Sequence, residues 1–151
     1  MEQTIRKVDH SALRVNQAFI IGLLGLAFVV DSLPRVVLVG AVMLVGTAVP
    51  AWGLFKVVYL YVLKPLNLIR PDVMVDNPEP HRFAQGFGGV VVAIAAAALL
   101  AQLTVLGWAL VWLVIVLAAL NLFLGFCAGC FLYYQLNRLG VPGFTASPIG
   151  R

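Results

Sequence analysis

Four long apolar runs restrict what this chain can fold into more than any other feature of its 151 residues. Each run is close to the ~20 residues that an α-helix needs to cross the hydrocarbon core of a bilayer, and is longer than a small soluble core requires. The sequence therefore predicts an all-α integral membrane bundle of four transmembrane helices. The runs extend approximately over Ala12–Val30, Arg35–Phe55, Phe83–Leu103 and Leu106–Leu132.

The composition agrees with a chain surrounded by lipid. Hydrophobic residues make up 62% and charged residues 11% of the sequence, whereas soluble domains have roughly 45–50% and 25%. The formal charge of +4 comes from lysines and arginines scattered singly or in pairs between the apolar runs, without the clustered basic stripe of a nucleic-acid-binding protein. We therefore expect a lipid bilayer, and no nucleic acid, as a partner.

The distribution of positive charge predicts the orientation of the spans. An even number of spans places both termini on one side, and a cytoplasmic N-terminus puts every lysine and arginine except Arg35 on the cytoplasmic side, in accord with the positive-inside rule. We divide the chain into a cytoplasmic N-terminal segment 1–11, a transmembrane domain 12–136 and an irregular cytoplasmic tail 137–151.

A short pattern occurs at the start of two of the runs. Residues 14–19 and 82–87 share Arg-x-x-Gln-x-Phe, each at the cytoplasmic entry of a predicted helical hairpin. Two related hairpins that start on the same side would be parallel repeats about an axis near the membrane normal. A match of three positions in six is also compatible with chance, so duplication and coincidence both stay open at this point.

The two cysteines of the chain form a single Cys-x-x-Cys motif, Cys127-Ala-Gly-Cys130. This is the spacing of dithiol redox sites and of half a zinc site, and a second such motif that would favour zinc is absent. Within one long fourth helix the pair would lie toward the C-terminal end, where the helix dipole does not stabilise a thiolate. We expect Cys127 to lie deeper in the membrane and Cys130 nearer the cytosol, so that Cys130 meets a partner first.

Polar residues gather at the depth of the cysteines. Polar groups inside spans usually face the protein interior and mark a site, although positive-inside anchoring of the arginines, hydrogen bonds between helices and simple packing of the cysteines are the structural alternatives. The predicted supporting residues are Arg14, Asn16, Gln17, His81, Arg82 and Gln85. We predict no cofactor and no metal, because zinc on Cys127, Cys130 and His81 needs a fourth ligand that the sequence does not supply.

The segments around these residues resemble a bacterial integral-membrane family, domain of unknown function 4395. The likeness extends over about residues 8–136 and rests on Arg14-x-Asn16-Gln17 after an N-terminal Asp-His, on Asn77–Gln85 and on Phe126–Tyr133. Its most specific element is the Phe-Cys-x-Gly-Cys segment, residues 126–130, supported by Arg-Phe-Ala-Gln at residues 82–85. The resemblance implies a multi-pass protein of the bacterial plasma (inner) membrane, Cys127 and Cys130 as the reactive pair, and association with thioredoxin-like or rhodanese-like proteins. The family often has an acidic residue after the second cysteine, where this chain has Phe131.

Three functions fit the sequence. The first is a membrane thiol-redox or sulfur-relay protein in which one cysteine attacks a partner disulfide or persulfide and the other resolves the product. The second is a small non-catalytic structural subunit that packs against a larger membrane complex through small residues such as Gly89, Ala93 and Ala97 of the third run. The third is transport of a small sulfur species through the bundle.

Overall fold

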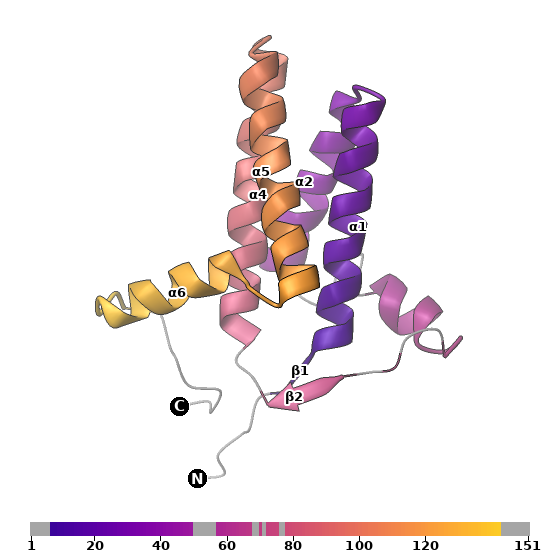
Figure 1. The fold of residues 1–151 in the computed structure, drawn as a ribbon, viewed down its shortest axis with the longest axis vertical. Helices are drawn as coiled ribbons and strands as arrows, with labels where there is room; N and C mark the ends of the chain where they lie inside the picture. Colours follow the sequence, from indigo (N-terminus) through magenta and orange to yellow (C-terminus); the bar gives the residue numbers. More distant parts are fainter. Residues whose placement is uncertain (1–6, 50–56, 68–69, 71, 76–77, 143–151) are drawn as a thin grey trace.

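The computed structural model describes residues 7–49, 57–67, 70, 72–75 and 78–142, and within them the chain is almost entirely helical. Four helices stand side by side, and a fifth, α6, runs sideways away from them near one end (Figure 1). A short π-helix and a two-stranded sheet lie near the same end. The elements are β1 (Lys7–Asp9), α1 (His10–Val29), α2 (Leu33–Ala48), η2 (Tyr59–Leu63), β2 (Val73–Val75), α4 (Pro78–Leu100), α5 (Thr104–Leu124) and α6 (Ala128–Arg138).

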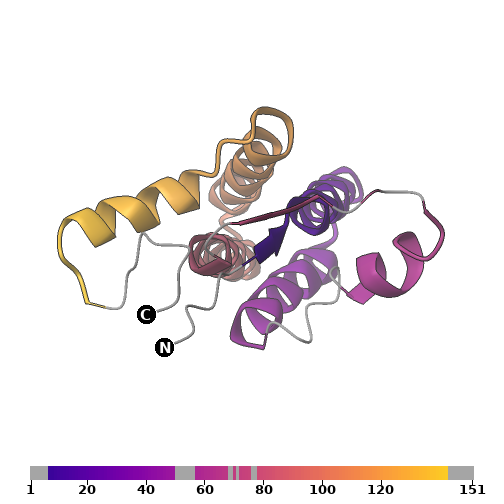
Figure 2. The same cartoon turned by 90° about the horizontal axis from the view of Figure 1, so that it is seen from below.

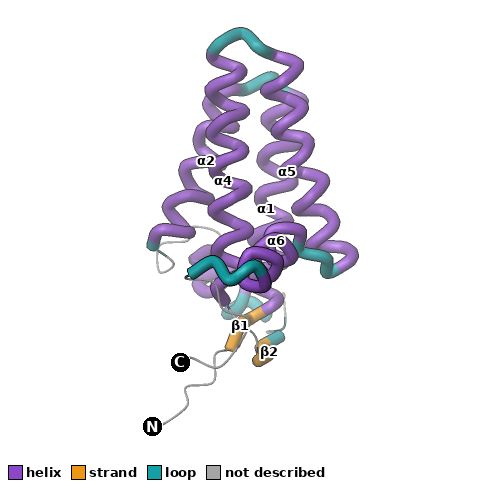
Figure 3. Tube along the Cα trace, turned by 90° about the vertical axis from the view of Figure 1, so that its left-hand side faces the viewer, coloured by secondary structure: helices purple, strands orange, loops and turns teal. Residues whose placement is uncertain are grey.

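The four upright helices pack as a closed ring. Helices α1 and α4 each contact both α2 and α5, so that α1 and α4 lie diagonally across the bundle. The turns of the α1–α2 and α4–α5 hairpins lie at the same end (Figure 3), and α1 and α4 therefore run in the same direction. This is the arrangement expected of two parallel hairpins, while their origin by duplication stays a prediction.

One apolar side chain from each upright helix fills the centre of the ring. Leu24, Val36, Val92 and Val111 are fully buried. The outer surface is also apolar, and large hydrophobic residues of every helix are exposed on it. Exposing apolar surface to water costs about 25 cal/mol for each Å², whereas exposing it to lipid carries no such cost. The bundle therefore has the outer surface of a membrane protein.

Among the described residues, three helices are long and apolar enough to cross a membrane: His10–Val29, Glu79–Leu100 and Thr104–Leu124. Helix α2 has 16 residues, and at 1.5 Å per residue it is about 24 Å long, shorter than the roughly 30 Å of the hydrocarbon core. Residues 50–56, which include the end of the predicted second span, lie outside the described residues. The all-α prediction is confirmed, and crossing by a fourth helix stays a prediction.

The predicted fourth span is wrong in one respect that decides the geometry of the site. The apolar run to Leu132 is not one helix, because α5 ends at Leu124 and α6 begins at Ala128 in a new direction (Figure 2). Gly125 adopts φ 68° and its N–H donates to the Asn121 carbonyl oxygen at 3.1 Å. Glycine enters this left-handed conformation without a steric penalty, and it commonly ends a helix there.

A small sheet joins the start of α1 to the segment before α4, and it was not predicted. Strand β1 pairs antiparallel with β2, with Val8 opposite Met74. Asp9 caps α1 by accepting from the backbone N–H of Ser11 at 3.0 Å, and it also accepts from the Tyr59 hydroxyl at 3.0 Å. Burial, and secondarily the Asp9 carboxylate, raise the pKa of Tyr59 above its usual value of 10.0. The segment predicted as cytoplasmic residues 1–11 is thus structured from Lys7 onward.

Candidate functional site

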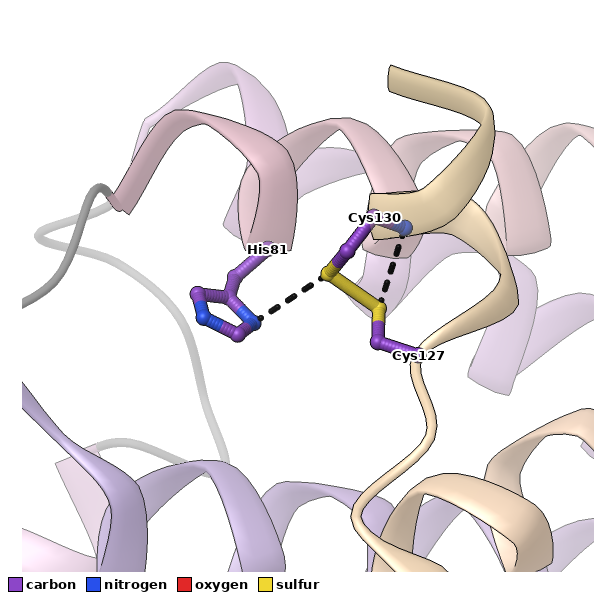
Figure 4. Close-up of side chains that lie close together, drawn as sticks. All are labelled: His81, Cys127 and Cys130. Carbon is purple, nitrogen blue, oxygen red and sulfur yellow. Dashed lines mark hydrogen bonds between the residues drawn. A yellow bond between two sulfur atoms is a disulfide. The ribbon is translucent and has the colours of Figure 1, made fainter. Parts of the chain in front are cut away.

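The two cysteines lie at the N-terminus of a helix. Cys127 is the N-cap of α6, with an extended backbone conformation, and its sulfur accepts a hydrogen bond from the Cys130 N–H at 3.1 Å (Figure 4). The two sulfurs are joined in a disulfide across a Cα–Cα distance of 5.1 Å. The change of backbone direction at Cys127 supplies the adjusted turn that a three-residue spacing requires for a disulfide.

This position contradicts the predicted location toward a helix C-terminus. The N-terminal turn of α6 presents free backbone N–H groups and the positive end of the helix dipole. Both stabilise a negatively charged sulfur at Cys127, and helix N-termini are a usual setting for reactive cysteines. The physical reason for the error is the break after Leu124, since a single helix through this region would have reversed the direction of the dipole at the sulfurs.

The two sulfurs have different surroundings. Cys127 is half-buried, whereas Cys130 is 8% exposed and its sulfur lies 3.5 Å from Nδ1 of His81 on α4. The expected order of access, with Cys130 the more reachable, is therefore wrong. In the disulfide form a protonated Nδ1 can donate to the Cys130 sulfur, and after reduction the same nitrogen can exchange a proton with the Cys130 thiol.

Helix α4 holds the first turns of α6 in place. Gly129 lies against Ala84, so closely that a Cβ atom at Gly129 would fall 2.6 Å from the Ala84 Cα. One turn later, the Tyr133 hydroxyl donates to Glu79 Oε2 at 2.7 Å, and the Tyr133 ring packs edge-on against Phe83. These contacts fix the cysteines relative to α4, and therefore relative to His81.

A cavity of about 250 Å³ lies inside the bundle beside the cysteines. Cys127 lines it, with Ala128 and Gly129 of α6, and most of its other walls are apolar. Three amide side chains also line it: Gln17 of α1, Gln85 of α4 and Asn121 of α5. Gln17 and Gln85 are the matching glutamines of the repeated Arg-x-x-Gln-x-Phe pattern, so the two hairpins contribute equivalent side chains to one cavity.

The predicted supporting residues divide into two groups. His81 lies at Cys130, and Gln17 and Gln85 line the cavity that Cys127 also lines. Arg82 instead donates to the Thr47 carbonyl oxygen at 2.8 Å, at the C-terminal end of α2. Arg14 is exposed and Asn16 is half-buried. Roles for these last three residues at the sulfurs stay predictions. Asn121 was missed as a cavity residue because its place depends on where α5 ends.

The same atoms could also take part in a metal site. One nitrogen of His81 and the sulfurs of Cys127 and Cys130 all lie within 4.8 Å of one another. Once reduced, the pair and the histidine would supply three of the four donors that a structural zinc needs. The disulfide form offers no thiolate, so metal binding and disulfide formation are competing uses of this pair.

Comparison of its sequence with known proteins identifies the family of the chain. No curated protein and no solved structure matches it. A family model does match over residues 8–138, a stretch that includes every described helix and both cysteines. The chain therefore belongs to the family described as Domain of unknown function (DUF4395).

Proposed function

We propose that the chain is a membrane thiol-redox protein in which Cys127 and Cys130 cycle between a dithiol and a disulfide. The observation that carries the proposal is the position of this pair at the N-terminus of α6, with His81 against the more buried sulfur. Helix N-termini favour the thiolate, which is the attacking and leaving form in disulfide exchange.

In the proposed exchange with a partner dithiol, each residue of the site has one role. A partner thiolate attacks the half-buried Cys127 sulfur, the Cys127–Cys130 bond breaks, and the electron pair leaves on the Cys130 sulfur, where His81 donates a proton. The second thiolate of the partner then attacks the partner sulfur that is bonded to Cys127. Cys127 leaves as a thiolate next to the Cys130 N–H. The partner ends as a disulfide, and this chain ends as a dithiol.

We further propose a plasma-membrane location with α6 on the cytoplasmic side. The end of the bundle that carries α6, β1 and β2 also carries Lys7, Arg82 and Arg138, and Arg70, whose carbonyl oxygen accepts from the Ser11 hydroxyl at the start of α1. Arg35 lies at the start of α2, at the other end. This asymmetry agrees with the positive-inside rule. Thioredoxin-like or rhodanese-like proteins, which handle disulfides and sulfane sulfur, are the soluble partners that we propose.

Trapping with glutathione disulfide tests the proposal on the purified chain in detergent. After reduction, the wild type should react to give its internal disulfide and two glutathione molecules. Cys130→Ser should accumulate a mixed disulfide on Cys127, because the resolving thiol is missing, and Cys127→Ser should accumulate much less. Failure of the reduced wild type to form the internal disulfide would refute redox cycling, and stronger trapping on Cys127→Ser would refute the order of attack.

A double Cys127→Ser/Cys130→Ser variant separates this function from that of a structural subunit. Normal function with normal assembly would support a structural subunit.

Transport of a small sulfur species requires a path through the bundle, and the part of the ring farther from α6 is filled by fully buried Leu24, Val36 and Val111. Uptake into liposomes no faster than into empty vesicles would remove transport.

A further inference from the structure

The cavity beside Cys127 has the features of a site for a small neutral ring. Its volume of about 250 Å³ lies below the roughly 300 Å³ at which pockets begin to enclose drug-sized ligands. None of the described residues that line it is charged. The Gln85 amide already donates to the Met43 carbonyl oxygen at 3.3 Å, whereas the amides of Gln17 and Asn121 can donate hydrogen bonds to carbonyl oxygens of a ligand. The remaining walls suit an apolar ring.

The cavity opens on the flank of the bundle that faces lipid. Three of its lining residues are also large exposed hydrophobic side chains, namely Phe87 of α4, Leu113 of α5 and Leu132 of α6. A residue that both lines a cavity and is exposed belongs to its rim. An apolar rim on α4 and α5, two helices that are able to cross a membrane, admits a ligand that arrives through the bilayer.

Cys127 connects this cavity to redox chemistry. Its sulfur is half of the disulfide, and Cys127 lines the cavity, while Cys130 contacts His81. A ligand in the cavity therefore lies against Cys127, while the proton-exchanging histidine lies against the sulfur of Cys130. A dithiol that is to become a disulfide again needs an acceptor for two electrons and two protons.

We propose that this cavity binds the ring of a membrane quinone, which oxidises the Cys127–Cys130 dithiol. Two S–H bonds break and one S–S bond forms. The two electrons enter the quinone ring and the two protons end on its two oxygens, giving the hydroquinone. The isoprenoid tail leaves past the rim into lipid. This inference rests on the proposed redox function and names its lipid-soluble electron acceptor.

The test is oxidation of the reduced chain in detergent, without oxygen, by decylubiquinone, whose fully substituted ring does not add thiols. We expect one hydroquinone for each disulfide formed, at a rate far above that of the chain denatured in SDS. Leu117→Trp puts an indole into the cavity and should slow this reaction about tenfold or more. The matched control is Val116→Trp, which changes an exposed residue that does not line the cavity, and it should leave the rate unchanged.

A second variant guards against misfolding of the first. Gln17→Leu removes one amide donor without adding bulk, and should raise KM for decylubiquinone roughly 2- to 13-fold, the effect of one hydrogen bond, with little change in kcat. The matched control Val116→Trp should also exchange with glutathione disulfide at the wild-type rate. Normal exchange with no quinone reduction, or equal quinone rates in Leu117→Trp and Val116→Trp, would overturn the quinone site alone. Loss of both reactions in the wild type would overturn the redox function itself.

Discussion

Gly129→Ala tests whether close packing of α6 on α4 holds the sulfurs against His81. The new Cβ would lie 2.6 Å from the Ala84 Cα, and ordinary van der Waals contact begins at 3.4 Å. The obstructing atom belongs to the backbone, so α6 has to move by about 0.8 Å or more, at a cost of about 1–3 kcal/mol for overpacking. The Cys130 sulfur and His81 Nδ1, now 3.5 Å apart, would then separate beyond effective hydrogen-bond contact.

Two measurements in detergent check this reasoning. Gly129→Ala should lower the thermal unfolding temperature, and it should slow exchange with glutathione disulfide toward the rate of a variant without His81. Gly25→Ala is the matched control, because a Cβ at Gly25 meets nothing within 4 Å, and alanine in a helix is neutral to stabilising relative to glycine. Gly129→Ala behaving like Gly25→Ala in both measurements would refute the positioning role of this contact.

Three further predictions concern the groups around the site. His81→Phe should slow disulfide exchange at neutral pH by about 10²-fold, the lower end of acid–base contributions. Its unfolding temperature should fall less than that of the packing variant Gly129→Ala, and an unchanged exchange rate would remove His81 from the mechanism. Tyr133→Phe removes the hydroxyl that binds Glu79, which should cost about 1 kcal/mol and speed hydrogen exchange in α6 but not in α1. The pKa of Tyr59 is raised in the folded state, so the stability that this tyrosine contributes is complete below pH 10 and is lost as pH rises through the folded-state pKa. As alkaline pH rises, the unfolding temperature should therefore fall more steeply in the wild type than in Tyr59→Phe. Identical slopes would contradict this.

Hydropathy predicted the order of the helices well. The spans starting near Ala12 and Phe83 correspond to α1 and α4, because long apolar runs between polar turns leave a membrane chain few other solutions. The structure extends both helices toward their N-termini, to His10 and Pro78. The capping carboxylate of Asp9 explains the first extension, since it satisfies backbone N–H groups at the start of α1.

The local geometry of the site could not be predicted from hydropathy. The run through Leu132 is apolar on both sides of the break, and hydropathy carries no information about the φ angle of Gly125. The glycine two residues before Cys127 was the available signal for a helix end. The small residues of the third run do not share one environment, because Gly89 is buried against Met43 and Leu44 of α2, while Ala93 and Ala97 are exposed. A four-residue spacing marks a helix face without saying which neighbour it meets.

The orientation of α6 has a consequence for how the sulfurs respond to the membrane itself. An upright span shifts or tilts when the bilayer becomes thicker or thinner. If the upright helices cross the bilayer as proposed, α6, which runs sideways near one end of them, would keep its first turn level with the headgroups of one leaflet. Helix α6 exposes apolar Phe131 and Leu132 beside polar Gln135 and Arg138, so it can lie in the plane of the membrane interface. Soluble carriers on one side and lipid-borne molecules on the other would then meet the same disulfide in membranes of different thickness.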